Sequence, residues 1–135
     1  MTQTELGYVF GVTNQTVSGW ETAGDTMPLI KLIKFSNLYG YSLDYIVGFT
    51  RFNINYGNNA KCDKYAIGKR LKSLRLSLNL TQEKIAKVCG ISQTAYSGYE
   101  NGHYLINTIT LYTICKKNKI SMDWIIGRSK NQSIK

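Results

Sequence analysis

The side chains that could catalyse a reaction or bind a metal are few and scattered along this chain of 135 residues. The single histidine, His103, follows an Asn-Gly turn signal, so a solvated loop position is expected rather than a ligand or a general base. Cys62, Cys89 and Cys115 are odd in number and lack CxxC spacing, which favours core or incidental thiols over a disulfide or a metal site. The carboxylates form no cluster. The sequence therefore predicts no enzyme, no metal site and no cofactor.

The basic side chains are concentrated in the second part of the chain. Residues 1–50 contain two lysines and four acidic residues, a net charge of −2. Residues 52–135 contain fourteen basic and four acidic residues, a net charge of +10. A basic region attached to a mildly acidic one indicates that only the second part meets a polyanion. A charged, solvated face is the alternative explanation, so the charge needs a motif beside it.

Five amphipathic segments follow residue 63 and predict five helices. In the first, Ile67, Leu71, Leu74 and Leu78 recur at three- and four-residue steps. The helices are expected over 64–79, 82–89, 93 to about 101, 108–117 and 122–126, with N-caps at Thr81, Ser92 and Ser121, and at Asn107 or Thr108. No segment alternates between apolar and polar residues as a strand would, so the chain is predicted to be all-α.

The chain is one pattern written twice, at a spacing of 79 residues. Of the 51 pairs formed by this shift, 13 are identical, where composition alone gives about three. We call residues 1–50 the first copy and residues 64–135 the second copy. The first copy repeats the last four helices, over Gln3–Phe10, Asn14–Glu21, Leu29–Tyr39 and Leu43–Val47, and has no counterpart of the first helix. The Asn-rich residues 51–63 between the copies are expected to be a linker.

Two short helices joined at a glycine are typical of a helix-turn-helix. Gly90 permits the positive φ that such a turn needs, and Ala86 allows close approach of the two helices. Ile85, Ile91 and Tyr96 are expected to hold the crossing from inside. An arbitrary helical hairpin is the alternative for one such pattern, but two copies in register favour the helix-turn-helix.

The segment LTQEKIAKVCGISQTAYSGYENG, Leu80 to Gly102, resembles the phage repressor and Cro-type helix-turn-helix family, the XRE-type regulators. Residues 64–127 cover its five-helix pattern. MTQTELGYVFGVTNQTVSGWE at the start of the chain resembles the same motif, and residues 1–48 cover helices two to five only. The resemblance implies tandem helix-turn-helix bundles, the first of four helices and the second of five.

The resemblance also assigns DNA contacts to particular residues. It places a phosphate contact on Gln82, whose amide at a helix N-terminus suits that role. It places base readout on Ser92, Gln93 and Thr94, with Ser97 one turn later. Gln93 is the strongest candidate, because an amide can bond adenine N6 and N7 together. Gly98 replaces the usual polar residue and leaves its position without side-chain readout.

Four lysines and one ion pair complete the predicted site. Lys69, Lys72, Lys84 and Lys87 are expected to meet phosphates, although each is also consistent with a solvated face. The family often pairs an arginine late in its first helix with the glutamate ending the recognition helix. Arg75 and Glu100 occupy those positions here, and Tyr96 and Tyr99 are expected in the core.

The first copy is expected to be an assembly or scaffolding unit rather than an independent reader. Gln3, Asn14 and Gln15 occupy the positions of Gln82, Gln93 and Thr94, so they are possible DNA-binding residues. However, this copy is acidic and lacks the helix that would cover Leu6, Val9, Val17 and Trp20. An uncovered apolar face tends to find a partner. That partner is the second copy, the linker or the same face of another chain, and we expect the last, a homodimer. Truncation of the first helix upstream is the competing explanation.

The sequence as a whole favours a sequence-specific regulator of double-stranded DNA, expected to be a repressor. The alternative is an antitoxin, or another protein-interaction component, with secondary DNA binding and a partner protein such as a toxin. No apolar stretch reaches the length of a membrane helix, and no signal pattern precedes the first copy, so a cytoplasmic protein is expected. The short polar tail after Gly127 predicts no effector domain.

Overall fold

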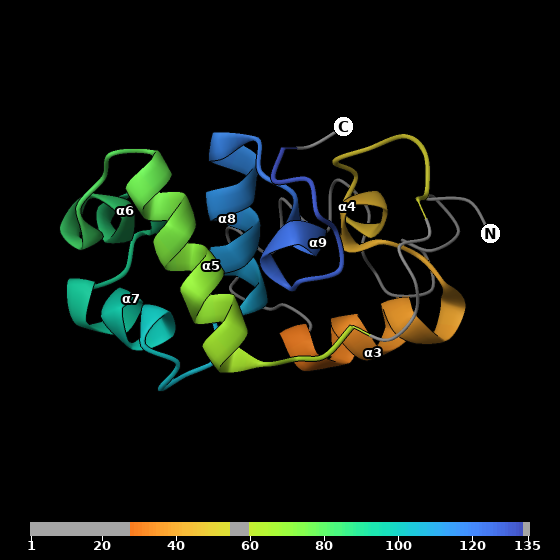
Figure 1. Cartoon of the computed structure of the whole chain (residues 1–135), viewed down its shortest axis with the longest axis horizontal. Coiled ribbons are helices and arrows are strands. Elements are labelled where there is room, and N and C mark those ends of the chain that lie inside the picture. Colours follow the sequence, from red (N-terminus) through yellow and green to blue (C-terminus); the bar gives the residue numbers. More distant parts are fainter. Residues whose placement is uncertain (1–27, 55–59, 134–135) are drawn as a thin grey trace.

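The described part of the chain is built from helices. The computed structural model describes residues 28–54 and 60–133. Within these ranges the helices are α3 (Leu29–Tyr39), α4 (Leu43–Ile46), α5 (Lys64–Ser77), α6 (Gln82–Cys89), α7 (Gln93–Glu100), α8 (Thr108–Asn118) and α9 (Met122–Ile125) (Figure 1). An isolated bridge joins Ile120 and Ser133. The predicted all-α class is confirmed for the described residues.

Side chains that cap helix N-termini set where the helices of the second copy begin. Oxygens of Thr81, Ser92 and Ser121 accept hydrogen bonds from the first turns of α6, α7 and α9, as predicted. Asn107 decides between the alternatives for α8, because its side chain accepts from the first turn of that helix. Asp63 caps α5, which sequence reasoning missed. These bonds satisfy N–H groups that have no partner inside the helix.

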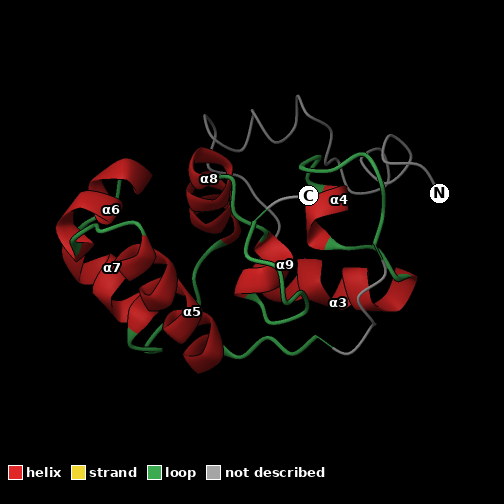
Figure 2. Cartoon of the chain, turned by 45° about the horizontal axis from the view of Figure 1, so that its top comes forward, coloured by secondary structure: helices red, strands yellow, loops and turns green. Residues whose placement is uncertain are grey.

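A continuous apolar core joins helices from both copies. Ile67, Leu71 and Leu74 of α5 are at most 1% exposed, and Leu43 of α4 and Ile125 of α9 are fully buried. All five belong to one cluster that extends from α3 to α9. Figures 1 and 2 show α6 and α7 at one end of the molecule and α3 and α4 at the other, with α8 and α9 between them. The core on which α6 and α7 pack therefore continues through α8 and α9 to α3 and α4.

The backbone of residues 29–48 repeats at residues 108–127. Helices α3 and α8 each have eleven residues and begin 79 positions apart, and so do the four-residue helices α4 and α9. The residues after α3 and α8, Gly40 and Lys119, are both left-handed, with φ of 73° and 54°. Gly48 and Gly127 match as well, at 87° and 88°. The shift found in the sequence thus reappears in the backbone of these two segments.

Residues 79 positions apart bind each other across the contact between α4 and α9. The Asp44 carboxylate accepts hydrogen bonds from Met122 N at 2.7 Å and from the Ser121 hydroxyl. In return, the Asp123 carboxylate accepts from Leu43 N and Asp44 N, both at 2.9 Å. Because Asp44 and Asp123 lie 79 positions apart, each copy places its aspartate on the helix start of the other. The contact is reciprocal.

The residues after α4 and α9 also reach across, but with different chemistry. Arg128 Nη2 donates to Ser36 Oγ and to Asn37 Oδ1 of α3, both at 2.7 Å. At the position matching Arg128, the first copy has Phe49, whose ring stacks on Tyr112 of α8 with centroids 5.2 Å apart. The second copy therefore contributes a charged side chain, Arg128, to the contact, and the first copy contributes an aromatic one, Phe49.

The described residues of the segment between the copies are not helical and pack on the first copy. Asn53 Oδ1 accepts from Ser42 N at 2.9 Å, and its Nδ2 donates to Gly40 O at 3.0 Å. Asn37 and Ala60 exchange two hydrogen bonds, of 2.9 and 3.1 Å. Asn53 of the connection and Asn37 of α3 therefore hold the described parts of the connection against the first copy.

Several sequence predictions lie outside the described residues. These are the helices expected over Gln3–Phe10 and Asn14–Glu21 and the apolar face containing Leu6, Val9, Val17 and Trp20.

Within the described ranges, none of the helices has the length and apolar character needed to cross a bilayer. Cys62, Cys89 and Cys115 are free thiols, and Cys115 is buried in the core.

Candidate nucleic-acid interface

A sharp turn at Gly90 joins α6 to α7. Gly90 has φ of 70°, and the next residue, Ile91, donates from its backbone N to Ala86 O at 3.0 Å. A Cβ added at Gly90 would have no atom within 4 Å, so the backbone angle rather than space favours glycine here. Ile85 and Tyr96 are buried between the helices, as the sequence predicted. The turn fixes the direction in which α7 leaves α6.

The beginning of α7 borders a surface hollow that gathers most of the predicted polar readers. Gln93, Thr94 and Ser97 of α7 line it together with Gln82 of α6. We call this the α7 hollow; its lining is Gln82, Gln93, Thr94, Ser97, Gly98, Asn101, His103 and Tyr104. Gln93 and Thr94 are exposed to solvent. Hydrogen-bonding groups from two helices thus face one concave surface.

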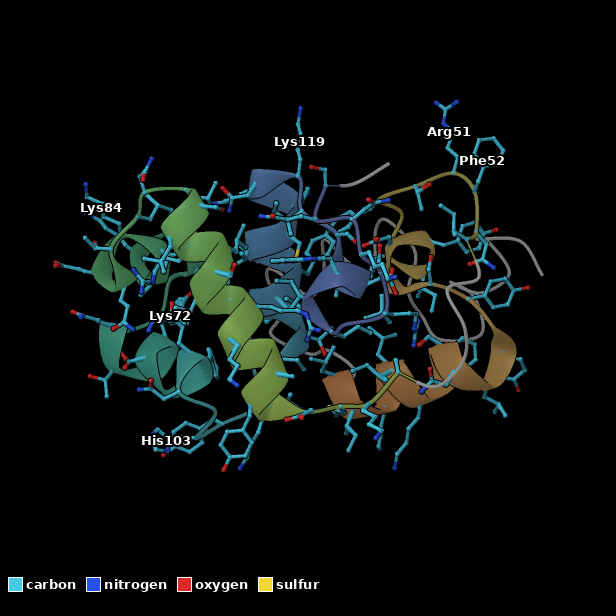
Figure 3. All side chains as sticks on the ribbon, in the orientation of Figure 1. Arg51, Phe52, Lys72, Lys84, His103 and Lys119 are labelled. Atoms are coloured by element: carbon cyan, nitrogen blue, oxygen red, sulfur yellow. The ribbon has the colours of Figure 1, made fainter. Side chains whose placement is uncertain are left out.

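Three lining residues were not predicted as contacts by sequence reasoning. Asn101, His103 and Tyr104 belong to the loop after α7, and all three are exposed. The Asn-Gly signal in the sequence predicted this loop, but it gave no reason to place the loop beside Gln93 and Thr94. His103 is a solvated loop residue, as expected, at the outer edge of the molecule (Figure 3).

Arg75 and Glu100 form an ion pair behind the α7 hollow. Arg75 Nε lies 2.7 Å from Glu100 Oε2, and Arg75 Nη2 lies 3.3 Å from Glu100 Oε1. The side chains are 12% and 2% exposed. Arg75 Nη1 also donates to Leu80 O at 3.0 Å, which ties the end of α5 to the start of α6. This bidentate pair locks α5 to the C-terminal end of α7.

Gln82 connects the ion pair to the α7 hollow. Its Nε2 donates to Glu100 Oε1 at 3.1 Å, so the orientation of the amide is fixed before any ligand binds. Burial raises the pKa of Glu100, but hydrogen bonds from Arg75, Tyr96 and Gln82 outweigh it and leave the pKa below its ordinary value. Glu100 is therefore held ionised, and it orients the residue to which a phosphate contact was assigned.

The remaining predicted residues are placed less centrally. Lys69, Lys72, Lys84 and Lys87 are exposed, and none of them lines the α7 hollow; Figure 3 shows Lys72 on α5 and Lys84 on α6. The Ser92 hydroxyl accepts from Ala95 N at 3.1 Å, and Ser92 does not line the hollow either. Its oxygen serves the helix cap.

The two tyrosines expected in the core differ in burial. Tyr96 is 1% exposed, and its hydroxyl, which bonds Glu100, also lies 3.4 Å from Leu71 O. Tyr99 is half-buried against the core, and Asn107 Nδ2 donates to its hydroxyl at 3.4 Å. Gln3, Asn14 and Gln15 of the first copy lie outside the described residues.

A comparison with known protein families identifies the same segment. A family model described as Helix-turn-helix matches residues 71–125. Over 64 residues, 47% of this chain, the sequence is 42% identical to the antitoxin PezA of Streptococcus pneumoniae. Over 62 residues, 46% of this chain, it is 39% identical to the cryptic phage CTXphi transcriptional repressor RstR of Vibrio cholerae. These matches span 40% of PezA and 55% of RstR. The family model and the turn at Gly90 together identify a helix-turn-helix within residues 71–125.

Proposed function

We propose that this chain is a sequence-specific regulator of double-stranded DNA, a transcriptional repressor that reads the major groove with α7. The observation that carries the proposal is the α7 hollow, where the amide of Gln93 and the hydroxyl groups of Thr94 and Ser97 stand on a helix held by the Arg75–Glu100 pair. Amides and hydroxyls at the start of such a helix can bond base edges. The similarity to a phage transcriptional repressor supports the regulatory role.

Charge and helix geometry support DNA as the partner. Residues 52–135 carry a net charge of +10, which favours a polyanion. Gln82 is the first residue of α6, so its backbone N–H and its amide stand where a phosphate is favoured. Lys69, Lys72, Lys84 and Lys87 would attract the duplex from the solvated faces of α5 and α6.

An antitoxin is the second function that an observation favours. The chain is 42% identical to PezA over 64 residues, and an antitoxin would bind a toxin protein as its main partner. Residues 71–125 match the helix-turn-helix model, and such a domain would serve DNA binding under either function. A toxin encoded beside this protein, and bound by it, would support the antitoxin role.

Self-association belongs to the same proposal. A homodimer would use the apolar residues Leu6, Val9, Val17 and Trp20 of the first copy. Helices α4 and α9 cover each other within one chain, so a dimer has to use a different surface. Sedimentation of the full chain tests this, and a monomer at micromolar concentration would contradict it.

Selection of binding sites from random duplexes at fixed salt tests the proposed function. The wild type should enrich one sequence motif. Gln93→Ala should weaken binding to that motif by roughly 1–3 kcal/mol and relax preference at one or two base pairs. Lys84→Ala is the matched control, since it should weaken all sequences similarly and reduce the salt dependence. No enriched motif would contradict DNA reading and favour the interaction role.

A further inference from the structure

Gly98 lies on α7 where a side chain would face the α7 hollow, one turn after Thr94. A Cβ added at Gly98 would lie 2.7 Å from Tyr104 Cδ2 and 3.1 Å from Cε2. Such distances are shorter than van der Waals contact, so the tyrosine ring fills the space that a side chain at residue 98 would use. Glycine here is therefore not simply a missing contact. Its place on the surface is taken by a residue from the following loop.

The loop that carries Tyr104 is fixed to α7 by hydrogen bonds. His103 N and Tyr104 N both donate to Gly98 O, at 3.0 and 3.4 Å. Asn101 Nδ2 donates to Ser97 Oγ at 3.2 Å, within the same turn. These bonds hold the backbone of Tyr104 beside α7. The position of the ring is thus set by the helix that it accompanies.

The ring is presented to solvent rather than to the core. Tyr104 is 65% exposed and lines the same hollow as Gln93 and Thr94. A tyrosine that served packing alone would bury most of its ring, as Tyr96 does at 1% exposed. A phenol offers an apolar face together with a hydroxyl that both donates and accepts, which suits contact with a base edge.

We propose that Tyr104 is a specificity-determining residue that replaces the side chain absent at Gly98. It contacts the DNA beside the bases read by Gln93 and Thr94, and it sets the preference at one further base pair. The inference rests on the proposed DNA-binding function and deepens it. The first copy has Gly19 at the sequence position of Gly98 but Asp25 at that of Tyr104, so the tyrosine belongs to the second copy alone.

Tyr65 provides a matched control within the same chain. It is 61% exposed and also covers a glycine, since a Cβ at Gly102 would overlap with the Tyr65 ring at Cδ1. However, Tyr65 does not line the α7 hollow. The two tyrosines share chemistry, exposure and a glycine neighbour, and they differ in their position relative to the readers.

The test compares the sites selected from random duplexes by the wild type, Tyr104→Ala, Tyr104→Phe and Tyr65→Ala of the full chain. Tyr104→Ala should lose preference at one base pair and bind the wild-type site about tenfold more weakly. Tyr65→Ala should select the wild-type site with unchanged affinity. Circular dichroism melting establishes that each variant is folded. If Tyr104→Ala does not fold, Tyr104→Phe decides, because a relaxed preference supports the proposal and an unchanged site and affinity overturn it.

A second substitution tests whether a new base preference can be gained as well as lost. In the Tyr104→Ala background the space beside residue 98 is free, so Gly98→Ser can place a hydroxyl there. The double variant should select a site that differs from the wild-type site at the same base pair. If Tyr104→Ala keeps the wild-type site and affinity while Gln93→Ala changes them, the role of Tyr104 is overturned and the proposed function stands. If the wild type enriches no motif, both are overturned.

Discussion

Glu100 at the end of α7 and Asp44 at the start of α4 are both buried carboxylates, 7% and 5% exposed. Glu100 lies beside a positive charge, whereas Asp44 lies beside another negative one. Glu100 meets the Arg75 guanidinium and the Gln82 amide, and its pKa lies below the ordinary value. Asp44 meets a second carboxylate, Asp123. Burial and that neighbour raise the pKa of Asp44 to about 7, although Ser121 and Met122 donate hydrogen bonds to it.

The difference teaches that the two ends of the molecule are stabilised in different ways. The end with the α7 hollow is fixed by a charge pair that stays ionised at any moderate pH. The contact between the copies is fixed by two carboxylates that cap helices, of which Asp123 also pairs with Arg128, and protonation of Asp44 relieves their mutual repulsion. A raised folded-state pKa gives stability that is present below the unfolded value of 3.8 and lost as pH rises toward 7.

The largest expected effect is the loss of Asp123. Asp123→Ala removes the acceptor of two backbone N–H groups of α4 and strands Arg128, whose side chain is 3% exposed and pairs with Asp123 at 3.3 Å. Breaking a buried pair of this kind costs about 3–5 kcal/mol of the free energy of unfolding. Urea unfolding measures it. Glu83→Ala, at an exposed acid of α6, is the control and should change stability by less than about 0.5 kcal/mol.

Removal of the cation at the other end should have a smaller effect. Arg75→Met leaves Glu100 without its ion pair but still bonded by Gln82 and Tyr96. Because Arg75 also keeps some contact with water, we expect a loss of about 2 kcal/mol, below the range for a fully buried pair. Thermal unfolding at pH 7 checks this expectation, and an unchanged midpoint would show that the pair contributes no stability.

Gln82→Met separates orientation from stability at the same end. The substitution keeps the shape of the side chain and removes one hydrogen bond to Glu100, at a cost of about 1 kcal/mol. We expect DNA affinity to fall for all sequences, because the residue assigned to a phosphate loses its amide. Gel-shift titration of the folded variant measures this. Full affinity would remove Gln82 from the contact surface.

Asp44→Asn should change the pH dependence more than the stability at neutral pH. In the wild type, stability should fall as pH rises from about 4 toward 7, because the folded protein binds a proton at Asp44 that the unfolded chain has released. Asparagine is neutral throughout, so the midpoint of the variant should be flatter over this range. Melting at half-unit pH steps tests it. A parallel fall in both proteins would assign the dependence to another group.

Glu100 predicts the opposite slope on the acid side. A lowered folded-state pKa gives stability that is present above the unfolded value of 4.5 and lost as pH falls through the folded one. The melting series for Asp44→Asn should therefore still lose stability at its acid end. The two pH windows meet near pH 4, so the wild type is expected to be most stable at about that pH.

Much of the helix-turn-helix could be predicted from the sequence. Thr81, Ser92 and Ser121 cap the helices that they were expected to cap, and Gly90 has the positive φ expected of the turn. Gln82, Gln93, Thr94 and Ser97 come together at one surface. Local signals suffice here because a cap or a turn depends on residues three or four positions away.

Tyr104 was not among the contacts predicted from the sequence, because its position depends on the side chain that Gly98 lacks. Nothing in the residues around it indicates that the ring covers Gly98, six positions earlier on another element. The four lysines show the converse, since their sequence positions fitted a DNA contact but none lines the hollow. A basic residue on a helix has several solvated directions, and sequence periodicity does not select among them.

The sequence by itself determined the helices, their caps and the spacing of 79 residues, because these follow from periodicity and from local hydrogen bonds. Only the tertiary structure decided that Asp44 and Asp123 cap each other's helices and that Arg128 crosses to Asn37. Such contacts join residues some 80 to 90 positions apart in the chain, so they depend on how the helices pack around the shared core. Packing brings together groups that are far apart in the sequence, and the residues next to each group do not indicate which partner it will meet.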